Sequence, residues 1–204
     1  MDQYQVISIL LSVAAFSVSG FTAYRTFLAK FTAKIYIRPR VILTRINDLP
    51  AVVIGCEIIN VSLKPGLVDD VLLVVKFRQS NGRGFDRHTF YPSFVRGDFN
   101  LYKTYSELDF EAFQSIPLAA NSRLIKYIVF NSGSESFTPS PGKGEIDLRF
   151  RLAREKRWRK IVNGSITLEI NDESAQIWGD PKGNSIMLET IENFSYRNNL
   201  LNNM

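Results

Sequence analysis

The chain has 204 residues, of which 45% are hydrophobic, and this length suffices for one domain with a sizeable core. Its single cysteine excludes an intramolecular disulfide, and its single histidine excludes the two-histidine zinc motifs. The net charge of +5 comes from the first 45 residues, so residues 46–204 are neutral overall. Domains that bind nucleic acid are usually basic. The neutral body therefore argues against nucleic acid as a partner, while leaving a local basic patch open.

Residues 3–24 form an uncharged run between Asp2 and Arg25. As a helix this run would be about 33 Å long, enough to cross a hydrocarbon core of about 30 Å. A secretory signal peptide would carry positive charge before its apolar core, whereas only Asp2 precedes this one. A buried core helix is the stronger rival, because serines dilute the hydrophobicity of the run. Buried helices seldom stay uncharged for so long at a terminus, so the sequence predicts a single membrane-spanning helix.

Six positive residues follow the span before the next acid, Asp48, and we call them the basic collar: Arg25, Lys30, Lys34, Arg38, Arg40 and Arg45. Short flanks rich in Lys and Arg stay on the cytosolic side of a membrane. We therefore expect the N-terminus outside and the C-terminal domain in the cytoplasm. Anionic headgroups attract basic residues near the surface at roughly 1 kcal/mol each, which makes the lipid bilayer an expected partner.

The span also has a distinct packing face. Small residues recur at intervals of 4, 3, 4 and 4, and so lie on one helical stripe: Ser8, Ser12, Ala15, Ser19 and Ala23. Small residues let two helices approach closely in lipid, so this stripe predicts a partner helix or a second copy of the chain. The alternative is that Ser and Ala are simply common in single spans.

Three segments follow from the change in periodicity. Aromatic and apolar residues at helical spacing predict that the helix continues to about Lys34, so residues 1–34 are a membrane helix with a basic extension. Residues 35–192 have a period near two and predict a β domain, and the Asn-rich residues 193–204 predict a flexible tail. The predicted strands are residues 35–46, 51–61, 67–78, 88–95, 124–130, 145–152, 166–170 and 185–191, with a strand and a short helix expected within residues 102–113.

Two of these strands are expected to form a hairpin, because Lys64-Pro65-Gly66 between them has the residues of a type II turn. Pro39 and Pro92 predict bends or strand edges. Seven or eight short strands at roughly ten-residue spacing favour a single antiparallel β-sandwich. Residues 60–66, running into Val71, loosely resemble turns in immunoglobulin-like modules of bacterial surface and membrane proteins. The resemblance implies an immunoglobulin-like fold and no site.

Few residues point to catalysis. A Ser-His-Asp triad would depend on His88 alone, with no Gly-x-Ser-x-Gly elbow to support it, and Gly142-Lys143-Gly144 lacks both the earlier glycine and the Ser or Thr of a phosphate loop. Glu107, Asp109 and Glu111 would share one face of a strand, where they could hold calcium or act as a glycosidase pair, although a solvated face is the simpler interpretation. We expect no catalytic, cofactor or metal site. Three Asn-x-Ser triplets begin at Asn60, Asn163 and Asn193 and have no role on the cytosolic side.

The strongest candidate for contact is a basic hairpin after residue 148. Seven positive residues fall within twelve positions that contain one acid and one tryptophan: Arg149, Arg151, Arg154, Lys156, Arg157, Arg159 and Lys160, with Glu155 and Trp158 among them. The candidate contact residues are those from 154 to 160 without Glu155: Arg154, Lys156, Arg157, Trp158, Arg159 and Lys160. Such a turn suits lipid headgroups, a phosphate backbone or an acidic protein surface, and the alternative is a solvated tip.

Three functions remain open from the sequence. The first is a membrane-anchored, cytosol-facing β-sandwich that acts as an interaction or scaffold module, with a protein partner within a membrane complex. The second is a lipid-handling domain, because 15 Phe and 8 Tyr could line a cavity. The third is a membrane-tethered enzyme. The lack of a recognisable catalytic pattern favours the first, and we expect the protein not to be an enzyme.

Overall fold

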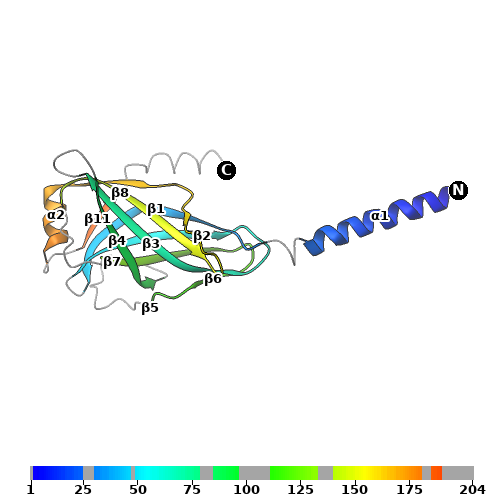
Figure 1. Cartoon of the computed structure of the whole chain (residues 1–204), viewed down its shortest axis with the longest axis horizontal. Coiled ribbons are helices and arrows are strands. Elements are labelled where there is room, and N and C mark those ends of the chain that lie inside the picture. The colour runs from blue at the N-terminus through cyan, green and yellow to red at the C-terminus, as the bar shows by residue number, and fades with distance from the viewer. Residues whose placement is uncertain are drawn as a thin grey trace.

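The computed structural model describes residues 2–24, 30–46, 49–78, 85–96, 111–132, 140–180 and 185–189. Its first element is helix α1 (Gln3–Ala23), which extends away from the rest of the protein (Figure 1). No residue of α1 is buried. The helix is long and apolar enough to cross a membrane, and a signal sequence would share these properties.

The described strands belong to one antiparallel sheet, which together with helix α2 (Asp172–Gly179) we call the body. Its order is β10-β8-β3-β4-β7-β2-β1-β11, with three short strands beside it, β5 on β4, β6 on β3 and β9 on β8. Figure 1 shows the sheet curling into a half-barrel, with α1 beyond one end and α2 at the other. The strands are β1 (Ala33–Ile46), β2 (Leu49–Asn60), β3 (Gly66–Arg78), β4 (Phe85–Arg96), β5 (Glu111–Ala112), β6 (Ile116–Leu118), β7 (Arg123–Ser132), β8 (Gly142–Leu152), β9 (Arg159–Lys160), β10 (Ile166–Ile170) and β11 (Ile186–Glu189).

Helix α2 closes the core at the end opposite α1. Its Trp178 ring stacks on Phe90 with centroids 6.4 Å apart, and its Nε1 donates to the carbonyl of Ala51 at 3.2 Å. The Asn171 side chain accepts from the backbone N–H of Ser174, which caps the start of the helix. These contacts stabilise a helix of eight residues, a length that is marginal for an isolated helix.

Strand β2 is buried on both faces. Val52 and Ile54 belong to the main core, whereas Ala51 and Val53 belong to a smaller cluster that also includes Val129. Because alternate residues of a strand point to opposite faces, the second cluster lies on the other side of the sheet. A strand covered on both sides reads as a continuous apolar run, as β2 does in the sequence.

The prediction of a mainly β protein with an apolar N-terminal helix is confirmed. The immunoglobulin-like sandwich is not confirmed, because the described strands form one hydrogen-bonded sheet. The strand predictions around residues 124–130, 145–152, 166–170 and 185–191 correspond to β7, β8, β10 and β11. Pro39 lies within a register shift of β1, and Pro92 borders one in β4, so both prolines occur at strand irregularities, where a missing donor is tolerated.

The predicted hairpin across Lys64-Pro65-Gly66 is wrong. β2 pairs with β1 and β7, while β3 pairs with β4, β6 and β8, so consecutive strands lie apart in the sheet. The connection from β2 to β3 crosses the strands between them and is held by Asn60. The amide of Asn60 donates to the carbonyls of Lys64 and Ala119, both at 2.7 Å. The same side chain accepts from the N–H of Ser62 at 2.9 Å. This buried polar residue therefore specifies a crossover where the Pro-Gly pair suggests a tight turn.

The predicted helical extension to Lys34 is also wrong over residues 30–34, because β1 begins at Ala33 and the preceding described residues are not helical. Phe31, which continues the aromatic spacing, packs instead on Gly66: a Cβ at Gly66 would lie 2.2 Å from the Phe31 ring. The helical spacing of Phe31 therefore reflects its packing on Gly66 and not a continued helix. Residues 25–29 and the predicted tail at residues 193–204 lie outside the described residues.

Candidate functional site

The basic hairpin is formed by β8, a turn and β9. The N–H of Glu155 donates to the carbonyl of Leu152 at 3.0 Å, which closes a turn around Ala153 and Arg154. Arg154 has φ +67°, a left-handed conformation that glycine adopts more readily than arginine. β9 then pairs with β8 through Arg159 and Phe150. The predicted hairpin is therefore present, and a long cationic side chain occupies its most constrained backbone position.

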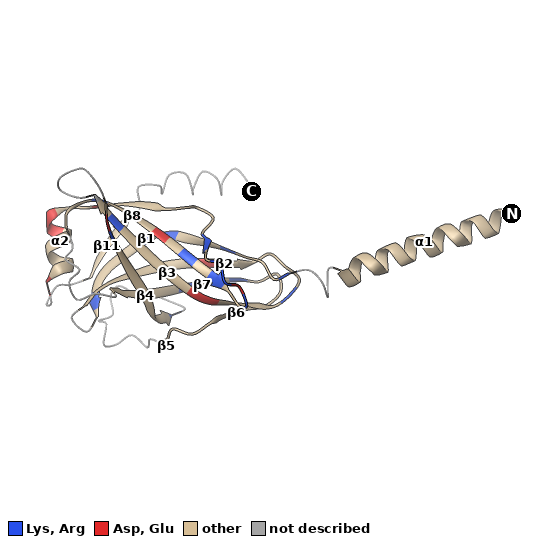
Figure 2. Cartoon of the chain, viewed as in Figure 1, with Lys and Arg blue, Asp and Glu red and all other residues tan. Residues whose placement is uncertain are grey.

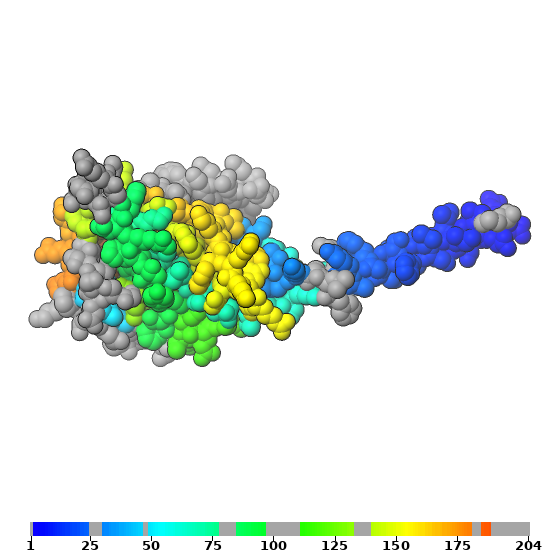
Figure 3. Space-filling model, viewed as in Figure 1, coloured from blue at the N-terminus to red at the C-terminus, as the bar shows by residue number. Residues whose placement is uncertain are grey.

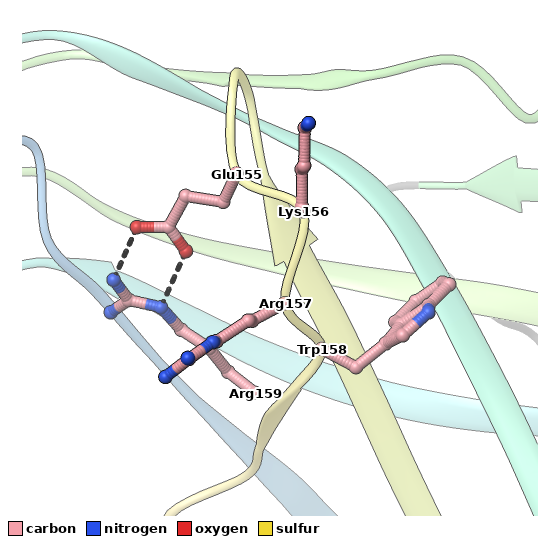
Figure 4. Close-up of a pocket in the computed structure, with 5 residues that line it drawn as sticks. All are labelled: Glu155, Lys156, Arg157, Trp158 and Arg159. Carbon is pink, nitrogen blue, oxygen red and sulfur yellow. Dashed lines mark hydrogen bonds and ion pairs between the residues drawn. The ribbon is translucent and has the colours of Figure 1, made fainter.

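Three of the seven positive residues in this hairpin are used within the fold. Arg149 pairs with the buried Asp147 at 2.8 Å, and Arg151 lies 3.3 Å from Asp70 and 3.5 Å from Asp69. Arg159 forms a two-pronged pair with Glu155, including an Nε bond of 2.8 Å (Figure 4). These pairs hold the base of the hairpin and neutralise part of its positive charge.

Four positive residues remain available. Arg154, Lys156, Arg157 and Lys160 are exposed, and none makes an ion pair with a residue that the structure describes. We call these four residues together with Trp158 the basic surface. Solubility alone is served by charges of both signs, interspersed, whereas here four charges of one sign stand together.

Trp158 is held in a defined position beside these charges. Its side chain is 37% exposed, and the guanidinium carbon of Arg151 lies 5.2 Å from the ring centroid, within range of a cation–π interaction. A hollow of about 490 Å³ is lined by Glu155, Lys156, Arg157, Trp158 and Arg159. Figure 4 shows Trp158 pointing to the opposite side of the turn from Arg157 and Arg159. The residues that line the hollow therefore place an aromatic ring and two guanidinium groups on opposite sides of the turn.

The basic surface belongs to the end of the body from which α1 departs. The N–H of Ala153 donates to the carbonyl of Leu67 at 3.1 Å, next to Gly66 and the Phe31 ring. Figure 3 shows the yellow segment that includes the turn at the surface, in the half of the body toward α1. Sequence reasoning could not place the turn relative to α1, because this proximity depends on the pairing of β3 with β8.

The basic collar is spread along β1 instead of being gathered at one end. Lys30 and Lys34 are exposed near the start of β1. Arg38 donates to the Tyr127 hydroxyl at 3.1 Å, and Arg40 lies further along the exposed side of the strand. Arg45 lies at the far end, where it donates to the carbonyl of Gly179 at the end of α2 at 3.0 Å. Figure 2 shows positive residues distributed over the length of the body.

Arg45 therefore stabilises α2 and does not belong to the end near α1. A strand rises about 3.3 Å per residue, so the twelve positions from Ala33 to Arg45 span roughly 40 Å, several Debye lengths at physiological salt. Arg25, the first residue of the collar, lies outside the described residues. Among the described residues of the basic collar, Lys30 and Lys34 therefore lie near the α1 end, and the role of the collar at a membrane stays a prediction.

The small-residue stripe of α1 is exposed along its whole length: Ser8, Ser12, Ala15, Ser19 and Ala23. The Ser12 hydroxyl donates to the carbonyl of Ser8 at 2.9 Å, and Ser17 and Thr22 bond to carbonyls one turn earlier in the same way. These bonds satisfy the hydroxyl donors inside the helix, as an apolar surrounding requires. The stripe's role in helix packing stays a prediction.

Other candidate groups are accounted for by the fold. Cys56 is fully buried, and burial raises the pKa of its thiol to about 12. His88 is half-buried, with its ring tilted against Phe77 at a centroid distance of 6.5 Å. Glu107 and Asp109 lie outside the described residues, and no metal-holding cluster of three His, Cys, Asp or Glu occurs within the part of the chain that the structure describes.

Two of the three glycosylation triplets have structural roles. The Asn60 amide is buried in the crossover, and the Asn163 amide donates to the carbonyl of Ile37 at 3.2 Å while its oxygen accepts from the Ile37 N–H. Asn163 thereby replaces a strand partner beside the β1 bulge. Neither amide is free to carry a glycan in this fold. Asn193 lies outside the described residues.

The interior gives the lipid-handling interpretation no support among the described residues. Its large side chains are fully buried, with Trp178, Phe90 and Phe130 each less than 2% exposed, and they occupy the face that the sheet encloses. The hollow described above lies outside this core.

Sequence reasoning missed a group of exposed aliphatic residues at the α1 end. Val61 and Leu63 lie in the crossover, Leu67 follows it, and Val162 lies beyond β9. Hydrogen bonds from Val61 to the carbonyl of Thr32 and from Val162 to that of Ile35 place them beside the start of β1. Scattered in the sequence, these residues show no common pattern before folding.

Comparisons with known proteins found no matching family model, no similar curated protein and no matching solved structure.

Proposed function

We propose that this chain is a membrane-anchored interaction module, with α1 crossing the bilayer and the body on the cytosolic side. In this proposal the body is a scaffold that holds a contact surface at a defined place next to the membrane. The N-terminus is outside, and Lys30 and Lys34 lie on the cytosolic flank of the helix, where positive residues are retained.

One observation carries the proposal. Four exposed cations without ion pairs in the described chain stand beside a positioned tryptophan, at the end of the body from which α1 departs. Charges of one sign attract a complementary surface and guide its approach. The Glu155–Arg159 pair and the β8–β9 pairing keep the turn in shape, so little ordering is required when a partner binds.

The test of this proposal measures protection of the basic surface in membranes. Cysteine is introduced at Lys160, within the surface, or at Lys143, an exposed residue near the start of β8. The natural Cys56 is fully buried and does not compete for a maleimide reagent. The reagent is applied to the full chain in opened native membranes and to the same chain purified in detergent.

We expect Lys160→Cys to react at least fivefold more slowly in the membranes than in detergent, and high salt to remove the difference. Lys143→Cys should react equally in both, and in sealed cells it should resist a membrane-impermeant reagent. Equal rates for Lys160→Cys would refute the contact surface. Reaction of Lys143→Cys in sealed cells would refute the cytosolic orientation.

A further inference from the structure

Resting on the proposed contact surface, we propose that its occupant is the anionic headgroup layer of the bilayer that α1 crosses. The body then lies against the membrane through Arg154, Lys156, Arg157 and Trp158. The ligand class is the phosphate-bearing, negatively charged lipid headgroup.

Position is the first argument. The Phe31 ring covers Gly66, and the adjacent Leu67 accepts the hydrogen bond from Ala153 at the start of the turn. Seven residues lead from Tyr24, at the end of α1, to Phe31, and seven residues reach at most about 25 Å. The basic surface therefore stays within reach of the headgroup layer whenever α1 is inserted. An acidic protein in solution could bind a surface anywhere on the body.

The composition of this end is the second argument. Val61, Leu63, Leu67 and Val162 are all exposed there, with Lys30 and Lys34 close by. Surfaces that lie at a membrane interface combine basic residues with aliphatic side chains and tryptophan, because the headgroup region is anionic outside and apolar beneath. A soluble acidic partner would account for the charges but not for four exposed aliphatic residues next to them.

The hollow at the turn suits a headgroup. Its volume of about 490 Å³ lies within the range of small-molecule sites. Lys156 and Arg157 can donate to phosphate and carboxylate oxygens, and the Trp158 ring can lie at the boundary with the acyl chains. Arg159 stays bonded to Glu155 and supports the wall of the hollow without being a ligand.

The experiment uses the full chain in nanodiscs and the fluorescence of its two tryptophans. The lipids carry bromine near the top of the acyl chains and are phosphatidylcholine alone or mixed with phosphatidylserine. Trp178 is 1% exposed and gives a constant background, which Trp158→Phe measures. We expect quenching of Trp158 in the anionic nanodiscs at low salt, and recovery of its emission at high salt.

The test variant is Lys156→Glu with Arg157→Glu. Each basic residue near an anionic surface contributes about a fivefold factor to the equilibrium constant for contact between the body and the headgroups. The double substitution should therefore lower this constant by at least about 25-fold and abolish the quenching. The control is Arg87→Glu with Lys143→Glu, two exposed residues in the half of the sheet away from α1. This control changes the net charge equally and should keep the quenching.

A second arm adds soluble polyglutamate to the phosphatidylcholine nanodiscs. A response of Trp158 to polyglutamate without a response to phosphatidylserine would overturn the lipid occupant and leave the contact surface intact. No response to either would overturn both proposals. Equal quenching in the two lipid compositions, or equal loss in the test and control variants, would overturn the recognition of anionic headgroups by this turn.

Discussion

Replacing Arg154 with glycine should raise the stability of the body and weaken the proposed contact of the basic surface with anionic headgroups. Arg154 has φ +67° in the turn that Glu155 and Leu152 close with a 3.0 Å hydrogen bond. A side chain in this conformation costs roughly 1–2 kcal/mol. Glycine removes that cost but adds freedom to the unfolded chain worth roughly 0.5–1 kcal/mol. The free energy of unfolding should therefore rise by about 0.5–1 kcal/mol.

The measurement is urea unfolding of the full chain in a mild detergent, followed by the fluorescence of Trp178 in a Trp158→Phe background. Arg154→Ala is the matched control, because it removes the same charge but keeps the Cβ and its backbone strain. We expect Arg154→Gly to be more stable than Arg154→Ala by about 1 kcal/mol, and both to lose about fivefold in affinity for anionic nanodiscs. Equal stability of the two variants would refute the strain argument.

Three further predictions concern the fold. Gly66→Ala should destabilise the body by about 1–3 kcal/mol, since the new Cβ would lie 2.2 Å from the Phe31 ring, and combining it with Phe31→Ala should recover part of the loss in a double-mutant cycle. Asn60→Ala should cost about 2–3 kcal/mol in urea unfolding, because it removes three hydrogen bonds of about 1 kcal/mol each, to the carbonyls of Lys64 and Ala119 and from the N–H of Ser62; a cost below 0.5 kcal/mol would contradict this role. The hydrogen bond from Ser165 and the nearby Lys76 lower the pKa of Glu145 below 4.5, so its contribution to stability is complete above that value and is lost as pH falls through the lowered pKa. Glu145→Gln should therefore lose less stability than the natural chain between pH 6 and pH 3, and an unchanged pH profile would contradict the assignment.

Strand β8 shows which parts of the fold the sequence could predict. Ile146, Leu148, Phe150 and Leu152 alternate with polar residues, and all four are buried on the core face. One face of this strand carries the main core, so its period of two is visible in the sequence. The return strand after it was predicted for the same reason, since Ile166, Leu168 and Ile170 also alternate with other residues. In the structure β9 and β10 both pair with β8.

Long-range pairing accounts for what the sequence could not predict. Lys64-Pro65-Gly66 has the local chemistry of a tight turn, but the pairing of β2 with β7 and of β3 with β8 separates the two strands. Helix α2 depends on Trp178 entering a core built by distant strands, so its own eight residues carry little signal. The sequence also could not show which cations of the hairpin are already paired. The ion pairs of Arg149 and Arg151 with Asp147, Asp69 and Asp70 depend on the fold and cannot be inferred from spacing.

The short connection between α1 and the body restricts where the protein can act. Only residues 25–29 separate Tyr24 from Lys30, and a chain of this length spans at most about 20 Å. When α1 crosses a bilayer, the body is confined to a thin layer beside it, and its search for partners becomes two-dimensional. Tethering of this kind gives effective concentrations in the millimolar range, at which contacts too weak to hold a free protein are occupied most of the time. Under that condition, binding partners of the body must themselves reside at, or be delivered to, the same membrane.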